Sequence, residues 1–399
     1  MNLSAAAAKD AILSLRDSYL LSQLSTDIML GEVAGGLYIE RMEPSFAEQM
    51  KKIYPASAHE AAAVDIGFSD DIEETLEALH AGDPSVHPFD TLLARMTDDE
   101  IGDALFDAIL SHTRRCPARE VTGSPYLSAV PLQERENGKI RLGSYTYMPG
   151  EFFQTYHDGF EPGAPFHYGT IGYFDEPVTV PVMYENGRVW MSIVESEIAS
   201  MQRPLADAKG HVITYGLGLG YYPFMASEKE EVQSVTVIER NPDVISIFKS
   251  ALLPHFPHRE KIRILQDDAF RYIKTQKDGA YEYGFADFWG GLYDGLALYM
   301  DFIPHCKHFQ ETSFDFWIES CFLESFFRPA ALQALMTCAG HSAAAVTGDR
   351  AAKKIQAAFA AYLLQDSLSL SSYDEVLTFL SNEALIPKVR AFAFDRARI

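Results

Sequence analysis

Three glycines and one carboxylate in this chain have the types and the spacing to hold a nucleoside-containing ligand. The glycines are Gly216, Gly218 and Gly220. They follow an apolar run at 212–215, and glycines in such a turn let the backbone approach a ligand closely. Glu239 ends a second apolar run at 235–239, where an acid can accept both hydrogen bonds of a ribose diol. The pattern predicts a cofactor site and does not by itself specify a reaction.

Three more acids follow later apolar runs. Asp267 and Asp268 come shortly after the run at 262–265, and Asp287 closes the run at 283–287. The carboxyl ends of parallel strands meet at one edge of an open sheet, where ligands bind in the crevice. We therefore expect these side chains to lie near the same crevice as the glycine turn.

Strands and helices alternate between residues 196 and 320, which predicts an α/β fold with a doubly wound, mostly parallel sheet. The five strands are expected at 212–215, 235–239, 262–265, 283–287 and 313–318. Each acid or glycine turn named above stands at or just after the end of one of the first four strands.

The flanking parts of the chain have a different texture. The predicted regions are a helical N-terminal region at 1–120, a β-rich lead-in at 121–195, the α/β domain at 196–320 and a helical C-terminal region at 321–399. Ile12, Leu15 and Tyr19 recur at helical spacing in the first region. In the second, two apolar runs flank Asn186-Gly187, a pair typical of a tight hairpin turn.

Composition limits the partners of this protein. The 399 residues carry a formal net charge of −23, which argues against a nucleic-acid partner or an anionic membrane. No apolar run approaches the length that crosses a bilayer. The 4 cysteines are scattered and form no CxxC pair, which is typical of reduced thiols. These features predict a soluble, cytoplasmic protein with no nucleic-acid or membrane partner.

The spacing of the glycines separates two classes of nucleotide cofactor. A dinucleotide fingerprint has the form GxGxxG, whose third glycine permits close helix packing beside a pyrophosphate. Here the third glycine comes one residue early, and Tyr221 stands where the fingerprint requires glycine. No phosphate-binding lysine follows, so the segment is not a P-loop. The GxGxG form resembles motif I of class I S-adenosylmethionine-dependent methyltransferases.

Three later segments resemble the spermidine synthase-like branch of that superfamily. They are 235–245, 262–273 and 281–289. With the glycine motif, the resemblance covers roughly 195–320, which is under a third of the chain. It implies a Rossmann-like methyltransferase fold of the seven-stranded type. It also implies S-adenosylmethionine, or its decarboxylated form, as the cofactor.

The resemblance also implies a role for each candidate residue. The glycines at 216, 218 and 220 would lie against the amino-acid portion of the cofactor. Glu239 would hold the ribose hydroxyls. Asp268 and the backbone at Ala269 would bind the amino edge of adenine, and the neighbouring Asp267 could exchange roles with Asp268. Asp287 would be the catalytic group, where the reactive carbon meets the acceptor.

The chain departs from aminopropyltransferases of this branch at two places. Those enzymes carry an Asp-x-x-Asp-Pro loop after the fourth strand, whereas here Asp287 is followed by Phe-Trp-Gly-Gly at 288–291. They also carry a Tyr-His-Glu triplet before motif I, whereas the stretch at 195–201 retains acids without that triplet. A polyamine is a polycation, so the loss of these groups weakens a polyamine as the substrate.

The leading interpretation is methyl transfer to a small-molecule acceptor, with Asp287 orienting or deprotonating an amine or a hydroxyl. The alternatives are aminopropyl transfer from decarboxylated S-adenosylmethionine, and a non-catalytic adenosyl-binding or scaffold protein. The glycines could also form a plain strand-to-helix turn, and Asp287 could cap a helix. The histidines and acid at 305–311 lack the partner pair of a zinc site, so no metal is expected. A homodimer remains open.

Overall fold

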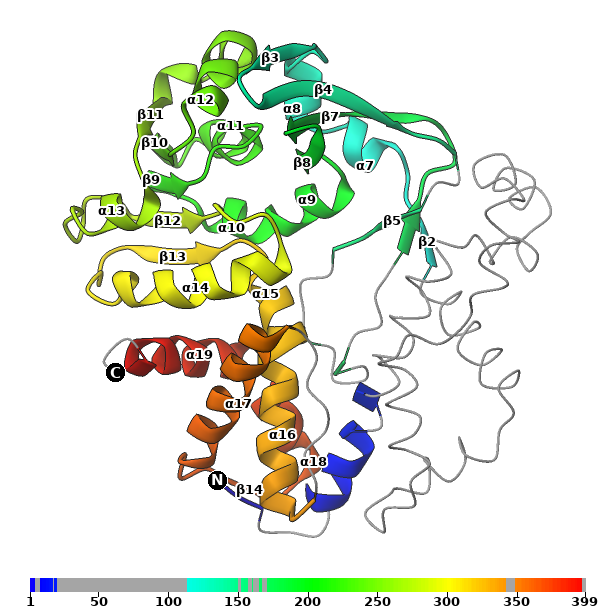
Figure 1. The fold of residues 1–399 in the computed structure, drawn as a ribbon, viewed down its shortest axis with the longest axis vertical. Coiled ribbons are helices and arrows are strands. Elements are labelled where there is room, and N and C mark those ends of the chain that lie inside the picture. The colour runs from blue at the N-terminus through cyan, green and yellow to red at the C-terminus, as the bar shows by residue number, and fades with distance from the viewer. Residues whose placement is uncertain are drawn as a thin grey trace. The chain divides into compact units, whose positions relative to one another are not determined.

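The computed structural model describes residues 1–3, 8–16, 18–19, 113–149, 152–156, 160, 165–166, 171–341 and 349–396 (Figure 1). The chain divides into two compact units. One comprises Met1–Arg115, Pro149–Tyr173 and Ser320–Phe392, and the other comprises Cys116–Met148, Phe174–Glu319 and Ala393–Ile399. Most of the predicted N-terminal region lies outside the described residues, although residues 8–16 are helical as their periodicity predicts.

The second unit is built on a five-stranded sheet in the order β11-β10-β9-β12-β13. Its strands are β9 (Gly210–Tyr215), β10 (Val232–Glu239), β11 (Ile262–Gln266), β12 (Tyr283–Ala286) and β13 (Ser313–Phe316). Every neighbouring pair is parallel. The five predicted strands are all present, and the predicted α/β class is confirmed. In the described part of the chain the sheet has five strands, fewer than the seven-stranded type.

One helix of this sheet precedes β9, and the other four begin after a strand of the sheet ends. They are α10 (Gln202–Asp207), α11 (Tyr221–Ser227), α12 (Pro242–Ile247), α13 (Ala269–Ile273) and α14 (Leu292–Cys306). Asn241 and Asp268 accept backbone hydrogen bonds at the starts of α12 and α13. Such side-chain caps satisfy N–H groups that have no partner inside the helix, and so they fix where each helix starts.

Both faces of the sheet are covered. Phe285 of β12 stacks on Tyr222 of α11, with ring centroids 4.3 Å apart. Tyr215 of β9 lies in register with Ala286, so it points to the face opposite Phe285. On that opposite face Tyr215 contacts Phe302 of α14, with ring centroids 5.0 Å apart. The predicted doubly wound arrangement is therefore confirmed.

A four-stranded antiparallel sheet belongs to the same unit, in the order β3-β4-β7-β8. Its strands are β3 (Arg135–Asn137), β4 (Ile140–Tyr147), β7 (Val178–Glu185) and β8 (Arg188–Ser192). Asn186 and Gly187 join β7 to β8 with φ angles of 51° and 77°, the positive values of a type I′ hairpin turn. The predicted hairpin is confirmed. Three short helices accompany this sheet: α7 (Arg119–Thr122), α8 (Pro125–Ala129) and α9 (Glu195–Ser200).

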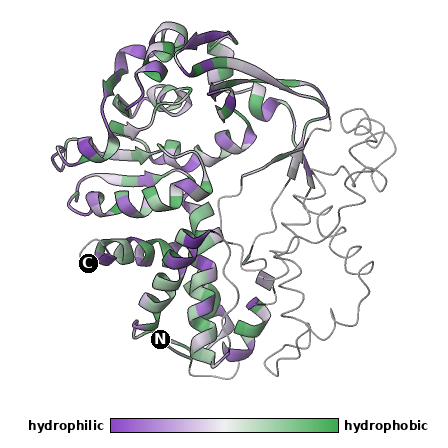
Figure 2. Cartoon of the chain, viewed as in Figure 1, coloured by the Kyte–Doolittle hydropathy of each residue, from purple (hydrophilic) through white to green (hydrophobic). Residues whose placement is uncertain are grey.

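The first unit is mainly helical. Its long helices are α16 (Arg328–Ala339), α17 (Arg350–Leu364), α18 (Tyr373–Leu380) and α19 (Asn382–Arg396), which runs past the end of the unit. Hydrophobic and hydrophilic residues are both present along these helices (Figure 2). In α17 and α18 they lie on separate faces, as in helices that bury one face, whereas most of the first nine residues of α16 are buried. Arg328 is 1% exposed and donates hydrogen bonds to the Leu380 carbonyl (3.1 Å) and to Asn382 Oδ1 (2.6 Å). It ties α16 to the junction of α18 and α19.

Short strands complete this unit and were not predicted from the sequence. They are β1 (Asn2–Leu3), β2 (Thr113–Arg115), β5 (Phe152–Gln154), β6 (Ile171–Tyr173) and β14 (Ser369–Leu370). β1 pairs with β14, and β2 with β6, across many residues of chain. Strands of two or three residues have no local periodicity, so only their long-range partners create them. No helix in the described ranges combines the length and the apolar character that crossing a bilayer requires.

Candidate functional site

The candidate site lies where the strand order reverses. The chain proceeds from β9 outward to β10 and β11, then returns across the sheet to β12 and β13. The reversal point is the gap between the carboxyl ends of β9 and β12, which is the usual ligand crevice of open α/β sheets. Gly216 follows β9 and Asp287 follows β12, and the Asp287 N–H donates to the Tyr215 carbonyl at 2.8 Å.

The ends of β9 and β12 lie so close together that position 216 requires glycine. Gly216 has a φ of 108°, and a Cβ atom there would lie 1.6 Å from the carbonyl oxygen of Asp287. Any side chain would force the ends of β9 and β12 apart. Gly218 and Gly220 also have positive φ angles, of 51° and 77°. The predicted glycine-packed strand-to-helix turn is therefore present, and Gly220 lies directly before α11.

Glu239 connects two of the strand ends. Its carboxylate accepts the Leu217 N–H in the glycine turn at 3.2 Å and the Asn241 N–H after β10 at 2.7 Å. Glu239 is 7% exposed, and burial raises its pKa while these backbone hydrogen bonds lower it. Each oxygen accepts one of the two bonds, and a carboxylate has about four lone-pair sites. The Arg240 backbone N–H also interacts with this carboxylate, which retains the capacity to accept a further hydroxyl.

The two neighbouring aspartates after β11 have different local partners. Asp267 pairs with the Arg271 guanidinium and accepts the Asp268 N–H at 2.7 Å. Asp268 Oδ1 accepts the Arg271 N–H at 3.0 Å as the cap of α13. Ala269 is the buried first residue of α13, so its N–H has no acceptor within the helix. The Asp267 N–H donates to the Glu239 carbonyl at 3.1 Å, which joins this segment to the end of β10.

Asp287 is half-buried and belongs to a group of acids. Burial, and to a lesser extent the carboxylate of Glu239, raise its pKa to about 7. Glu197 of α9, whose pKa is raised to about 8 by burial, is also influenced by the charge of Asp287. Carboxyl groups that are desolvated and close to one another hold their protons to higher pH. Among the sequence-predicted residues, Asp287 is the one suited to take up a proton near neutral pH.

An aromatic cluster lies beside Asp287. Phe288 contacts Phe270 of α13 at 5.7 Å, Trp289 at 5.1 Å and Phe302 of α14 at 5.0 Å between ring centroids. Trp289 is 6% exposed and Phe302 is fully buried. The Phe-Trp-Gly-Gly segment is thus anchored by packing, and the Asp294 carboxylate accepts the Gly290 N–H at 2.8 Å.

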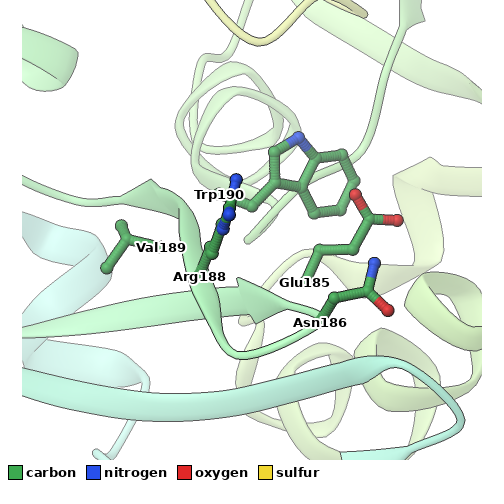
Figure 3. A pocket seen from close by; sticks show the side chains of 5 residues that line it. All are labelled: Glu185, Asn186, Arg188, Val189 and Trp190. Carbon is green, nitrogen blue, oxygen red and sulfur yellow. The ribbon is translucent and has the colours of Figure 1, made fainter.

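A separate hollow of about 550 Å³ lies at the tip of the β7–β8 hairpin. It is lined by Glu185, Asn186, Arg188, Val189 and Trp190. Figure 3 shows the Glu185 carboxylate on the same side of the hairpin as the Trp190 ring, with Val189 pointing away. None of the sequence-predicted site residues lines this hollow, and one exposed turn forms it. We place the candidate site at the crevice between β9 and β12 instead.

The structure assembles the predicted residues as expected from their positions at strand ends. The glycine turn, Glu239 and Asp287 lie around one crevice, and the Asp267–Ala269 segment is bonded to the end of β10. Sequence reasoning missed Glu197 as a site residue, although the retained acids before the glycine motif were a usable signal. It also missed Tyr126, Met191 and Phe248, which contact the turn from distant segments. No group of three or more His, Cys, Asp or Glu side chains within the described ranges could hold a metal ion.

Comparisons with known proteins give no family for this chain. No family model matches it, and no curated protein matches its sequence.

Solved structures with partial likeness include three spermidine synthases. A probable spermidine synthase from Corynebacterium glutamicum shares 14% identity over 44% of this chain, with a TM-score of 0.28, and the match spans 59% of its own length. The enzyme from Thermotoga maritima shares 12% identity over 51% of this chain and 74% of its own, with a TM-score of 0.28. A spermidine synthase in complex with the transition-state analogue AdoDATO shares 11% identity over 51% of this chain and 73% of its own, with a TM-score of 0.29. The assignment of this chain to the doubly wound α/β class follows from its own strand order and parallel strand pairing.

Proposed function

We propose that this protein is an S-adenosylmethionine-dependent transferase that moves a methyl group to a small-molecule acceptor. The observation that carries the proposal is the contact between Glu239 and the glycine turn, because it places a diol-binding acid and a ligand-binding turn side by side. Asp287 lies at the same crevice, directly against Gly216.

The chemistry of the donor set fits an adenosyl group. Glu239 would accept the two ribose hydroxyls with the capacity that its backbone bonds leave. The Ala269 N–H would donate to the adenine ring, and the Asp268 carboxylate would accept from its amino group. The glycine turn would lie against the amino-acid end. When bound, the cofactor would supply an electrophilic carbon on its sulfonium.

The protein's own part in this chemistry is to align, to exclude water and to hold a proton. An acceptor bound beside Asp287 would be held close to the cofactor, which would replace a bimolecular encounter by a prearranged one. Asp287 would take the proton from an amine or a hydroxyl. With a pKa near 7, its basic form increases through neutral pH, so we expect the rate to rise with pH over that range.

Aminopropyl transfer is the second candidate, and one observation favours it. Glu197 places a further acid beside Asp287, and an acidic crevice suits a cationic acceptor. It also suits a decarboxylated cofactor, which carries an amine and no carboxylate. The same site with no turnover would correspond to the third candidate, an adenosyl-binding scaffold.

Calorimetric titration with the two spent cofactors distinguishes these candidates. S-adenosylhomocysteine is the product of methyl transfer, and methylthioadenosine is the product of aminopropyl transfer. We expect S-adenosylhomocysteine to bind more tightly. Preference for methylthioadenosine would instead support the second candidate, and binding of neither would contradict the proposal.

Two substitutions make the test specific to the crevice. Glu239→Gln should weaken the binding of S-adenosylhomocysteine by about tenfold or more, because hydrogen bonds to a charged group contribute about 1.5–3 kcal/mol. Glu176→Gln removes an exposed acid of the same unit and should leave the affinity unchanged. Asp287→Asn should retain binding and lose turnover, whereas retained turnover would exclude Asp287 as the base.

A further inference from the structure

Residues from several distant segments of the chain contact the glycine turn. Gly216 lies against the Asp287 backbone, and a Cβ atom at Gly220 would lie 2.1 Å from the Phe248 ring. The Tyr126 hydroxyl donates to the Leu219 carbonyl at 2.5 Å. Tyr126 is fully buried and also contacts the Tyr221 ring at 5.7 Å. Contacts from three separate segments therefore hold the turn in place.

The middle glycine has a different kind of neighbour. A Cβ atom at Gly218 would lie 2.5 Å from Met191 Sδ and 3.1 Å from its Cε. Met191 belongs to β8, so the hairpin sheet places this side chain over the turn. Unlike Phe248 and Tyr126, Met191 is only half-buried. An unbranched methionine side chain has three rotatable bonds and adapts its shape readily.

We propose that the Met191 side chain moves when a ligand binds at the glycine turn. It thereby determines how well the turn accepts an adenosyl ligand that has an amino-acid end. This inference rests on the proposed function, because that function places the amino-acid end of the ligand against the turn. Met191 lies against Gly218. A ligand with an amino-acid end must turn this side chain away, whereas a ligand without that end leaves it in place.

The surroundings of the glycine turn include three acids, whereas Met191 is uncharged. Glu239 bonds to Leu217 within the turn, Asp287 lies against Gly216, and Glu197 is close to Asp287. Met191 contributes no charge that could pair with a ligand carboxylate. Arg240 interacts with Glu239 but is itself exposed. Met191 therefore distinguishes adenosyl ligands by their shape, because a ligand with an amino-acid end must displace its side chain.

Methyl-labelled methionine gives a readout that does not depend on turnover. The protein contains 12 methionines, and the Met191→Leu variant identifies the Met191 signal in a ¹³C-methyl spectrum. We expect S-adenosylhomocysteine to shift the Met191 methyl signal. Met148, which is 49% exposed and belongs to the same unit, serves as the internal control and should not shift. Methylthioadenosine, which lacks the amino-acid end, should leave both signals in place.

Affinities of a truncated variant complete the test. Met191→Ala should strengthen the binding of S-adenosylhomocysteine by about three- to tenfold, roughly 0.7–1.4 kcal/mol, because no long side chain then has to turn away. It should leave the binding of methylthioadenosine within about twofold. Val189→Ala truncates an exposed residue of the same strand and should change neither affinity. Equal or weaker binding of S-adenosylhomocysteine to Met191→Ala, or an unmoved Met191 signal in a protein that binds it, would overturn the inference alone. Failure of both the wild type and Met191→Ala to bind either ligand would overturn the proposed function as well.

Discussion

Burial and a neighbouring acid determine how Asp287 titrates. Its pKa is raised from 3.8 to about 7, first by burial and then by Glu239. The pKa of Glu197 is raised from 4.5 to about 8 by burial and, to a lesser extent, by Asp287 itself. Three carboxyl groups at one crevice oppose folding when all are ionised, so the arrangement costs stability. Such a cost is typical of a site retained for its chemistry.

The stability of the protein should therefore fall as Asp287 loses its proton. Between pH 3.8 and about 7, the folded state holds a proton on Asp287 that the unfolded state has released. The unfolded state binds fewer protons over that range, so the free energy of unfolding decreases as pH rises. Asp287→Asn removes this contribution. We expect the stability advantage of the variant over the wild type to grow through that pH range and to level off above it.

Denaturant titrations of both proteins at several pH values measure this difference. Asp175→Asn, at an exposed aspartate of the same unit, controls for the loss of one charge. A constant difference between wild type and Asp287→Asn at all pH values would contradict the assignment of the raised pKa to Asp287.

The strand-to-helix turn after β9 is the element on which the site depends. Its three glycines have positive φ angles, and each lies close to a different neighbour: the Asp287 backbone, the Met191 thioether and the Phe248 ring. Two of these neighbours come from the sheet end and the α12 region. The third comes from the hairpin, so both sheets of the unit define the shape of the turn.

Gly220→Ala and Gly187→Ala form a matched pair that isolates this packing. Both glycines have a φ of 77°, but a Cβ atom at Gly187 has no neighbour within 4 Å. Gly187→Ala should cost about 1–2 kcal/mol through backbone strain alone. Gly220→Ala should cost roughly 1–3 kcal/mol more, because its methyl group overlaps the Phe248 ring.

Chemical denaturation of the two variants measures both costs. Gly220→Ala should also weaken adenosyl ligands, while Gly187→Ala, in the hairpin turn, should not. Equal losses of stability would show that the Phe248 contact adds nothing to the backbone strain.

The molecule as a whole carries a net charge of −23. Charges of one sign repel one another in a compact state more than in an unfolded chain. The repulsion acts over the Debye length, which falls from about 30 Å at 0.01 M salt to about 8 Å at 0.15 M. Both units contribute acids, so salt should stabilise the whole chain.

Raising the salt concentration over this range should therefore raise the melting temperature by a few degrees. Sodium chloride and potassium chloride should act alike, because screening does not depend on the identity of a monovalent ion. A melting temperature that is unchanged or lower in salt would show that specific ion pairs outweigh the net repulsion.

Local sequence patterns were sufficient to predict the α/β class, the five strands, the hairpin at Asn186-Gly187 and the residues at the strand ends. These features follow from local rules, because apolar runs, turn residues and helix caps act over a few positions. Other features depend on contacts between residues that are far apart in the sequence. The short strands β1 and β2 exist only through distant partners. Tyr126, Met191 and Phe248 reach the glycine turn from separate segments, and Glu197 acquires its raised pKa from burial and from Asp287. Contacts and desolvation of this kind depend on the folded arrangement of the whole unit, so no local pattern encodes them.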